Sequence, residues 1–468
     1  MSGSRLFSVA SVSARVIVGA VAATGTVALV VLAIAAPWPQ FTSPPLALDV
    51  RPAASDVTLS CPGGIVISGR ASMDALAIDI AATPETTAGS PSAEAPTIIA
   101  LAVPDVQGDT GATAYREIPQ DGDRAKLAAA QNTSVAADDV RGLASAGCAT
   151  PLSESWLVGG ATTTGWSGFV QLGNPGDVPA SVELTVFTAD GASGMGSVVI
   201  VPPRSQRVLP LAGLAVAADN PVVRVTAQGA PVTATLQSNR IRTITPSGVD
   251  IQTAVALPDM RQVIPGVVVP AREVTADPDA ATTVVRVLSP ASDGTASVTA
   301  TATGQDAPAL GPITVPLKAG VPVDVELPGL EAGNYTVRVD GSLPIVSAVW
   351  QATQASAGGD YAWHAAAPVI AAPSMFAVAG GASATLHVVN DSAENAAVTV
   401  TAATGTQMQV AVPAGGAVAM PIARAGIYSI DADGVALRAA VSLVAPAGIA
   451  AYPVWSSEAL GKAVTVYP

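Results

Sequence analysis

The sequence is poor in the residues that most enzymes and nucleic-acid-binding proteins use for their chemistry. Only 12% of its 468 residues are charged and 4% are aromatic, and it has two histidines and two cysteines. Its lysines are Lys126, Lys318 and Lys462, and its net charge is −14. A surface this acidic and this poor in lysine cannot neutralise a row of phosphates. The composition therefore argues against a nucleic-acid partner.

Common catalytic motifs are absent from the sequence as well. It contains no HExxH, SxxK or GxxxxGK[ST] pattern, and GWSGF at 165–169 ends in Phe169 where a GxSxG elbow requires glycine. The two histidines, His364 and His387, are too few for a zinc site if the two cysteines form a disulfide, as we predict below. Strand alternation also places His387 on an exposed face. We therefore expect no metal, no cofactor and no enzymatic activity.

Hydrophobic residues make up half of the sequence, and an uncharged run at 16–36 is long enough to cross a bilayer as a helix. Arg5 and Arg15 precede this run, so the positive-inside rule places residues 1–15 in the cytoplasm and the bulk of the chain outside. The alternative is a signal peptide with a cleavage site at 33–35, which would release a secreted protein. We expect a single-pass protein of the cell membrane.

The two cysteines, Cys61 and Cys148, both follow this helix and are expected to meet an oxidising compartment. We predict a disulfide between them, with two separate thiols as the alternative. The predicted N-terminal region, 46–149, contains pieces typical of strands. A helical candidate lies near 123–131, and the low-complexity stretch 82–96 is expected to be a mobile loop.

One hairpin pattern occurs three times along the rest of the chain, at 170–187, 285–302 and 386–402. In each copy an alternating strand runs into a polar turn and a second strand follows. The turns begin at Asn174-Pro175, Ser289-Pro290 and Asn390-Asp391. Further downstream, 222–237, 336–351 and 428–443 each read as a strand, a glycine-containing turn and another strand.

Alternation with a period of two assigns the faces of these strands. It predicts that six residues point into a core: Val170, Leu172, Val285, Val287, Leu386 and Val388. Gln171, Arg286 and His387 share the outward position, and Phe187 faces away from the core on the second strand of its hairpin.

A spacing near 100 residues fits a whole domain for each copy, and a single hairpin face needs a second sheet to cover it. The sequence therefore predicts an all-β chain. It has three tandem β-sandwich modules, Ig-like or fibronectin-like, which follow the membrane helix and the disulfide-containing N-terminal region. The modules span 150–257, 258–358 and 359–468.

Two groups of residues carry the remaining site candidates. Asp250 and Asp360 occur in similar segments, and we interpret them as turn-stabilising residues at matching places in successive modules. Trp156, Trp166 and Trp363 lie near module junctions, where a tryptophan either packs an interface or offers a platform to a sugar ring.

The order of these features resembles a family of uncharacterised envelope proteins from high-GC Gram-positive bacteria, known only as a domain of unknown function. The likeness covers about 46–468 and is carried by the anchor, CPGG at 61–64, Cys148 and SWLVGGATTTGWSGFVQLGNPG at 155–176. GVDIQTAVALP at 248–258 and DYAWHAAAP after it contribute too. The resemblance implies work near a membrane glycosyltransferase on envelope glycans, and it supplies no catalytic residues.

The leading expectation is a non-enzymatic scaffold or assembly partner, anchored in the membrane and lying on the extracytoplasmic side of the cell envelope. Its candidate partners are glycosyltransferase machinery and envelope glycan. The first alternative is a glycan-binding protein that uses Trp156, Trp166 or Trp363. The second is a carboxylate-dependent glycoside hydrolase or lyase, since 35 acidic residues are available.

Overall fold

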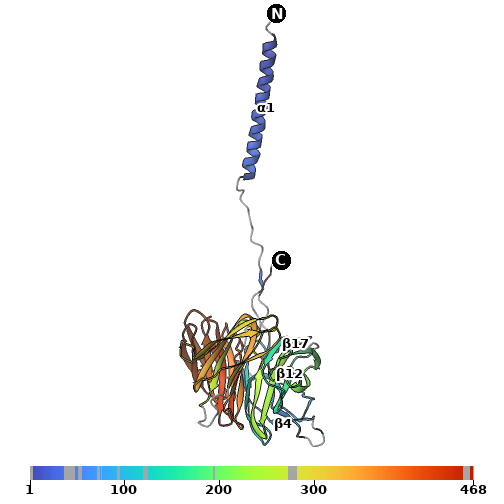
Figure 1. Cartoon of the computed structure of the whole chain (residues 1–468), viewed down its shortest axis with the longest axis vertical. Helices are drawn as coiled ribbons and strands as arrows, with labels where there is room; N and C mark the ends of the chain where they lie inside the picture. Colours follow the sequence, from blue (N-terminus) through green and yellow to red (C-terminus); the bar gives the residue numbers. More distant parts are fainter. Residues whose placement is uncertain are drawn as a thin grey trace. The chain divides into compact units, whose positions relative to one another are not determined.

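The computed structural model describes residues 4–35, 48–50, 55–70, 74, 76–91, 95–119, 125–192, 196–271, 282–456 and 464–466 (Figure 1). The chain divides into two compact units, Met1–Pro52 with Lys462–Pro468, and Ala53–Gly461. Strands account for 58% of the structure and helices for 6%, so the predicted all-β class is confirmed together with the single N-terminal helix.

The first unit contains helix α1 (Ser4–Ala35) and a short antiparallel pair formed by β1 (Leu48–Val50) and β35 (Val464–Val466). Within α1, Val16–Ala35 is long and apolar enough to cross a membrane. This fits a membrane anchor and a signal peptide equally well. The helix begins well before the predicted anchor at 16–36, and residue 36 lies outside the described residues.

The second unit begins with the N-terminal sheets, three sheets of three strands each, in the orders β2-β8-β6, β3-β4-β7 and β10-β9-β5. The Cys61–Cys148 disulfide is confirmed here. The strands are β2 (Val57–Cys61), β3 (Ile65–Ser68), β4 (Ile78–Ala82), β5 (Glu85–Gly89), β6 (Thr97–Ala100), β7 (Val106–Gln107), β8 (Thr113–Glu117), β9 (Ala128–Ala136) and β10 (Arg141–Gly147).

Two predictions for this region are wrong. The helical candidate near 123–131 is strand β9 from Ala128 onwards, and residues 123 and 124 lie outside the described residues. β9 is paired on both sides, by β5 and β10, and this pairing overrides the helix propensity of its alanines. The expected loop at 82–96 contains β5, which is paired with β9 along its whole length.

Residues 154–253 form the first sheet pair, in the orders β16-β12-β18-β19 and β11-β17-β13-β14, with β15 beside β13. Val170 and Leu172 on one sheet meet Val182 and Leu184 on the other in a common core. The elements are β11 (Glu154–Val158), β12 (Trp166–Asn174), β13 (Ala180–Thr188), β14 (Gly191–Ala192), β15 (Ser197–Val201), β16 (Ser205–Pro210), the 3-10 helix η1 (Leu211–Gly213), β17 (Val222–Gln228), β18 (Thr233–Arg242) and β19 (Thr245–Thr253).

Residues 259–365 form one seven-stranded sheet, in the order β23-β22-β25-β21-β24 with β20 and β26 also beside β25. Because the two halves of β25 pair with different strands, we call this region the second sheet pair. Its longest strand, β25, has 20 residues: its first half pairs with β20 and β22, and its second half pairs with β21 and β26. The predicted turn within 336–351 is therefore wrong, since Gly341 lies inside a continuous strand. The strands are β20 (Asp259–Val269), β21 (Thr283–Leu288), β22 (Gly294–Ala302), β23 (Leu310–Leu317), β24 (Val323–Glu326), β25 (Gly333–Ala352) and β26 (Tyr361–Ala365).

Residues 374–453 form the third sheet pair, in the orders β31-β28-β33-β34 and β27-β32-β29-β30. These orders repeat those of the first sheet pair. The strands are β27 (Ser374–Val378), β28 (Ser383–Asn390), β29 (Ala396–Ala402), β30 (Gln407–Val412), β31 (Ala417–Ile422), β32 (Gly426–Asp431), β33 (Leu437–Ala445) and β34 (Gly448–Pro453).

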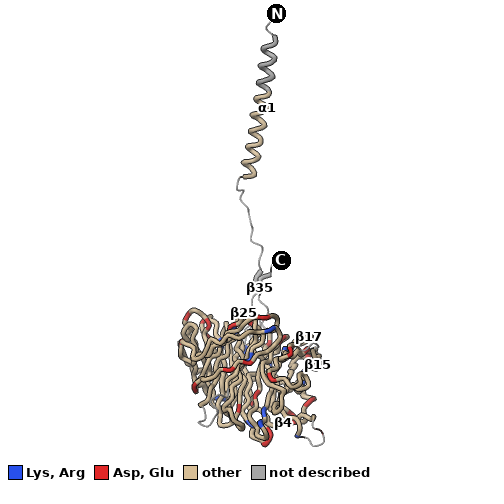
Figure 2. The backbone as a smooth tube through the Cα atoms, viewed as in Figure 1, with Lys and Arg blue, Asp and Glu red and all other residues tan. Residues whose placement is uncertain are grey.

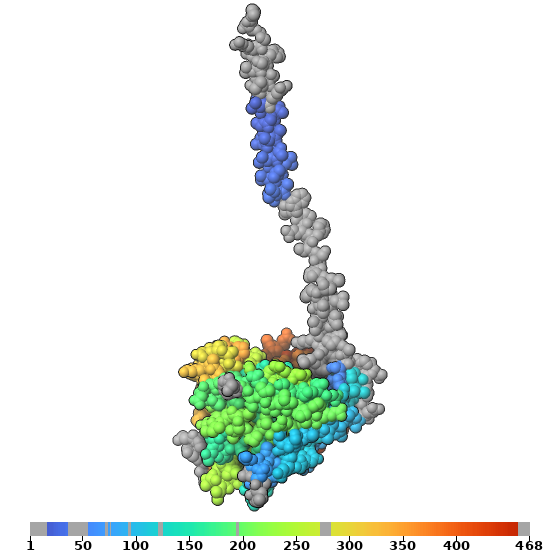
Figure 3. All heavy atoms as spheres, turned by 90° about the vertical axis from the view of Figure 1, so that its right-hand side faces the viewer, coloured from blue at the N-terminus to red at the C-terminus, as the bar shows by residue number. Residues whose placement is uncertain are grey.

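Four edge strands bring these parts together. β10 contacts β19, β19 contacts β26, β26 contacts β34, and β34 contacts β10, so the contacts form a closed cycle. Strands of the second and third sheet pairs accordingly run side by side in the body of the molecule (Figure 1). The N-terminal sheets lie directly against the first sheet pair (Figure 3), where Val66 and Val106 share a core with Phe169. Charged residues gather mainly towards strand ends and loops (Figure 2).

The closed cycle explains why the predictions of buried strand faces are correct and those of exposed strand faces are wrong. All six predicted core residues of the first strands are fully buried. Gln171, Arg286 and His387, predicted to face outward, are only 2%, 3% and 2% exposed, and Phe187 is 5% exposed. These four predictions are wrong because the neighbouring sheets of the cycle cover the second face of each strand.

Candidate functional site

The centre of the cycle is held by one carboxylate. Asp360, directly before β26, accepts hydrogen bonds from the backbone N–H groups of Leu143, Val249 and Ile449, at 3.1, 3.2 and 3.1 Å. These three donors lie on β10, β19 and β34, so a single side chain joins all four central strands.

Glycine precedes each of the three donors because the carboxylate approaches the backbone closely. Gly142, Gly248 and Gly448 have φ of +145°, +113° and +152°, values that L side chains rarely adopt. A Cβ on Gly142 would lie 2.4 Å from an oxygen of Asp360, and a Cβ on Gly448 would lie 1.6 Å from one. The sequence around the centre therefore combines one aspartate with three glycines.

A second buried acid, Asp250, lies within β19 and accepts a hydrogen bond of 2.9 Å from the N–H of Trp363. Burial raises its pKa to about 8. Burial also raises the pKa of Asp360 well above its usual value, although its backbone donors lower it. The prediction of matching turn positions is wrong, because one residue lies inside a strand and the other before a strand, and both are enclosed by the cycle.

Both histidines are buried at the junction between the second and third sheet pairs. Burial lowers the pKa of His364 to about 3 and that of His387 to about 4, so both rings are neutral. The predicted exposure of His387 is wrong because Gly266 of β20 packs over its ring, while its Nε2 lies 2.8 Å from the Ser442 hydroxyl. The described residues contain no cluster of three or more His, Cys, Asp or Glu side chains placed to hold a metal.

Arg286 links the first and second sheet pairs. Its guanidinium makes two hydrogen bonds to Asp324, at 2.8 and 3.0 Å, and donates to the carbonyls of Gly160 and Pro221 at 2.8 and 3.2 Å. It also lies 4.8 Å from the ring centroid of Trp363. In the second copy of the hairpin, the residue predicted to face outward, Arg286, therefore makes a contact between two sheet pairs.

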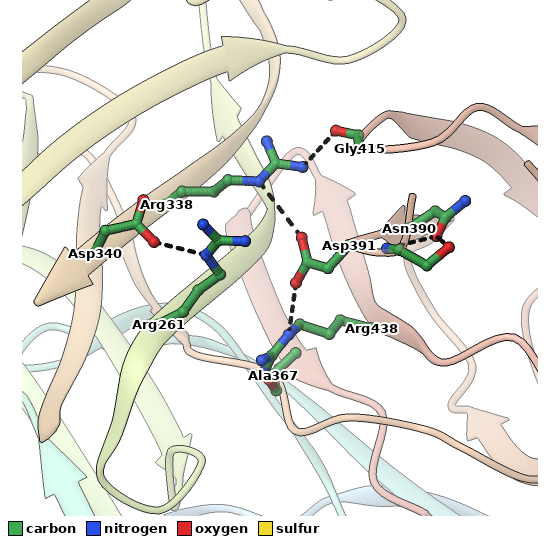
Figure 4. Close-up of polar contacts among 9 residues, drawn as sticks. Arg261, Arg338, Asp340, Ala367, Asn390, Asp391, Gly415 and Arg438 are labelled. Atoms are coloured by element: carbon green, nitrogen blue, oxygen red, sulfur yellow. Dashed lines mark hydrogen bonds and ion pairs between the residues drawn. The ribbon is translucent and has the colours of Figure 1, made fainter. Parts of the chain in front are cut away.

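Asp391 links the second and third sheet pairs (Figure 4). It lies between two arginines, with Arg438 Nε at 2.9 Å and Arg338 Nε at 3.6 Å. Arg438 also donates to the carbonyl of Ala367 at 2.6 Å, and Arg338 donates to the carbonyl of Gly415 at 2.9 Å. Arg261 and Asp340 form a separate, more exposed ion pair beside them.

The two remaining junctions of the cycle use amide side chains. Gln237 of β18 both donates to and accepts from the backbone of Val66 in the N-terminal sheets, at 2.6 and 2.9 Å. Asn132 of β9 donates to the carbonyl of Gly380 in the third sheet pair at 2.6 Å. Each junction thus has a buried polar side chain bonded to the backbone of its neighbour.

The repeated turns have a structural explanation as well. Asn174 donates to the carbonyls of Val178 and Val201 at 2.8 and 3.1 Å. Asn390 makes the equivalent bonds at 2.7 and 3.2 Å to the residues four and 22 positions on. Asp391, the residue after Asn390, stands where the first copy has Pro175, and its side chain pairs with arginine.

The predicted tryptophan platforms separate into two groups. Trp156 and Trp363 are 2% and 3% exposed: Trp156 stacks on Phe187 at 5.6 Å between ring centroids, and Trp363 lies under Arg286. Their burial argues against contact with a glycan. Trp166 is half-buried and remains a candidate.

The sequence analysis missed the partners of Trp166. Arg240 is its cross-strand neighbour on β18, with its Cζ 5.0 Å from the Trp166 ring centroid and 5.8 Å from that of Trp350. Trp350, on β25, is also half-buried. Strand pairing brings these residues together, and no local pattern in the sequence reveals it.

The fold and its junctions define a β-rich protein with one N-terminal apolar helix, whose sheets close around a buried carboxylate. The chain belongs to the family of unknown function DUF5719, whose model matches residues 103–423. No curated protein matches its sequence. The matched region begins just before β7 and ends between β31 and β32, so it includes three of the four central strands.

Proposed function

We propose that the chain is a non-enzymatic scaffold or assembly partner, anchored in the membrane on the extracytoplasmic side of the cell envelope of a high-GC Gram-positive bacterium. The observation that carries this proposal is the closure of four central strands around Asp360, which makes Ala53–Gly461 one unit. A single compact unit of this size suits a protein that holds others in place. Buried polar side chains such as Gln237, Arg286 and Asn132 are engaged in its junctions.

The finer architecture belongs to the same proposal. We propose that each sheet pair is one β-sandwich of Ig-like or fibronectin-like type and that the modules lie at 150–257, 258–358 and 359–468. The matching strand orders of the first and third sheet pairs support this division. β26, which these boundaries assign to the third module, pairs with β25 of the second, so the modules share their edges.

The N-terminal helix gives the proposed location. We propose that residues 16–36 stay in the membrane, with 1–15 in the cytoplasm, and the alternative is secretion after cleavage near 33–35. The mass of the mature protein, isolated from cell membranes and from the medium, distinguishes the two, because cleavage removes nearly all of the apolar segment.

Crosslinking in intact membranes, followed by purification of the full-length chain, tests the scaffold. We expect a reproducible set of envelope proteins that includes a membrane glycosyltransferase. The control carries residues 1–52 on an unrelated secreted domain. Recovery of the same set with that control, or turnover of wall polysaccharide that a single Asp or Glu substitution abolishes, contradicts the proposal.

Two alternatives are distinguished by particular residues. Glycan binding is supported by the half-buried Trp166 and Trp350, whose rings are not fully covered. A hydrolase or lyase needs two accessible carboxylates, and the enclosure of Asp250 and Asp360, 0% and 4% exposed, argues against these two as its acids.

A further inference from the structure

The surface where the first and second sheet pairs meet carries a cation between two aromatic rings. Trp166 begins β12, Arg240 lies opposite it on β18, and Trp350 comes from β25 of the second sheet pair. The Arg240 guanidinium is within 6 Å of both indole centroids, the range of a cation–π contact. Tyr361 packs edge-on against Trp166, with 5.3 Å between the two ring centroids.

Arg240 has no carboxylate partner among the residues that the structure describes, in contrast to Arg286 and Arg438 at the junctions. Burial and the neighbouring Arg242 both lower the pKa of Arg240, which means that its cation is held in a partly desolvated and electropositive place. An unpaired cation in such a place is costly unless an anion joins it.

The backbone is irregular at the same point. The pairing of β18 with β19 shifts register between Asn239 and Ile241, so Arg240 lies opposite a β-bulge that Ser247 and Gly248 form on β19. Bulges re-aim a side chain and are common beside binding sites. Gly165, next to Trp166, accepts a hydrogen bond from the N–H of Ile241 at 2.7 Å, and a Cβ there would lie 2.4 Å from the Ile241 carbonyl oxygen. This close approach fixes Trp166 beside the bulge.

One polar group at the site lacks a partner. The indole N–H of Trp350 is buried and makes no hydrogen bond within the described structure. A buried donor without an acceptor destabilises the folded state. A ligand oxygen that reaches this N–H beside Arg240 would supply the acceptor.

We infer that Trp166, Arg240 and Trp350 form a binding site for an acidic sugar, whose ring lies on the indole of Trp166 and whose carboxylate pairs with Arg240. Flat aromatic faces suit the C–H face of a sugar ring, and a guanidinium suits a carboxylate. The inference gives the glycan-binding alternative a site and a ligand class. It does not depend on the scaffold proposal, which stands or falls with the crosslinking experiment.

Calorimetric titration of the full-length chain in detergent tests the site with tetragalacturonic acid, cellotetraose and inorganic phosphate. We expect the acidic oligosaccharide to bind at least about tenfold more tightly than the neutral one, and phosphate alone to bind more weakly than either. Equal affinity for the two oligosaccharides contradicts a role for Arg240. Phosphate binding as tight as that of the acidic oligosaccharide shows an anion site with no sugar specificity, and binding of neither oligosaccharide also overturns the inference.

Variants assign the roles of the residues. Arg240→Gln should weaken the acidic oligosaccharide about tenfold and leave the affinity for cellotetraose unchanged, whereas Trp166→Ala should weaken both and Trp166→Phe should restore most of the binding. Arg424→Gln, at an exposed arginine of the third sheet pair, is the matched control and should change nothing. If Trp166→Ala fails to fold, Arg240→Gln against Arg424→Gln still decides, and equal affinities in that pair overturn the inference.

Discussion

At the scale of single residues, the interior of this protein depends on charges and polar groups that have no access to water. Asp360 alone accepts backbone hydrogen bonds from three different strands, and it does so within a chain that has few charged residues. Substitutions of Asp360, Gly448 and Asp250 therefore test how much this centre contributes to the stability of the fold.

Asp360→Ala should lower the free energy of unfolding by at least about 3 kcal/mol, since it leaves three buried N–H groups without an acceptor. Urea unfolding followed by circular dichroism measures the loss. The control is Asp177→Ala, whose side chain is 68% exposed and pairs with Arg204 at the surface. It should change stability by less than about 1 kcal/mol. Equal losses in the two variants would mean that the three hydrogen bonds contribute little.

Gly448→Ala should be far more destabilising than Gly434→Ala. Both glycines have positive φ, +152° and +87°, but a Cβ on Gly448 meets the Asp360 carboxylate whereas one on Gly434 meets nothing within 4 Å. The control therefore carries the conformational cost alone, about 1 kcal/mol, and the excess in Gly448→Ala reports the close approach. Thermal melts of the two variants check this, and similar melting temperatures would contradict it.

Stability should fall as the pH rises from 6.5 to 8, and Asp250 should be a cause. Its folded pKa of about 8 lies above the unfolded value near 4, so in this window the folded state holds a proton that the unfolded state has lost. The slope from this group is about 1.4 kcal/mol per pH unit. His364 and His387, with lowered pKa values, oppose it only below about pH 6.5.

Asp250→Asn keeps the acceptor for Trp363 and removes the titration. Between pH 6.5 and 8, the free energy of unfolding of this variant should therefore fall less steeply than that of the wild type, by about 1.4 kcal/mol per pH unit. Urea midpoints at several pH values measure the difference. Parallel pH profiles for the two proteins would show that Asp250 is ionised when buried.

At the scale of elements, the junctions between sheets determine which strand faces are buried. Arg438→Gln should lower the free energy of unfolding by about 2–4 kcal/mol, because it leaves Asp391 with one distant partner and removes the bond to Ala367. Arg261→Gln is the control, since Arg261 and Asp340 are 50% and 44% exposed, and it should change stability by less than about 0.5 kcal/mol. A double-mutant cycle with Asp391→Asn measures the coupling, which should be near zero if Asp391 and Arg438 act independently.

The elements also show how far the sequence could predict the fold. Alternation found the inward residues of β12, β21 and β28, because one face of each strand packs on its own sheet pair. It could not find that Gln171, Arg286 and His387 are buried on the other face, because closure brings together strands far apart in the chain. The same limit applies to β25, whose central glycine suggests a turn in the sequence, although both halves of the strand are paired with strands distant in the chain.

The candidate site was less predictable than the fold. Trp166 could be selected from composition, but Arg240 and Trp350 could not, since they reach it from β18 and β25 by strand pairing. Asp250 and Asp360 lie in similar segments of the sequence, yet the role of Asp360 depends on glycines in three other strands. In both cases the chemistry arises between elements that are distant in sequence.

At the scale of the whole molecule, the central claim is that β10, β19, β26 and β34 close into one cooperative unit around Asp360, rather than belonging to three independent modules. The disulfide supports the N-terminal sheets, and each junction has its own buried polar contact. A cycle of this kind loses its stability as a whole, because the opening of one junction exposes two sheet faces.

Native-state hydrogen exchange of the full-length chain is the most direct test of that claim. The amides of Leu143, Val249 and Ile449, which donate to Asp360, should exchange with one common free energy equal to that of global unfolding. Exchange of these three amides with separate free energies, each matching the unfolding of one sheet pair, would contradict the account.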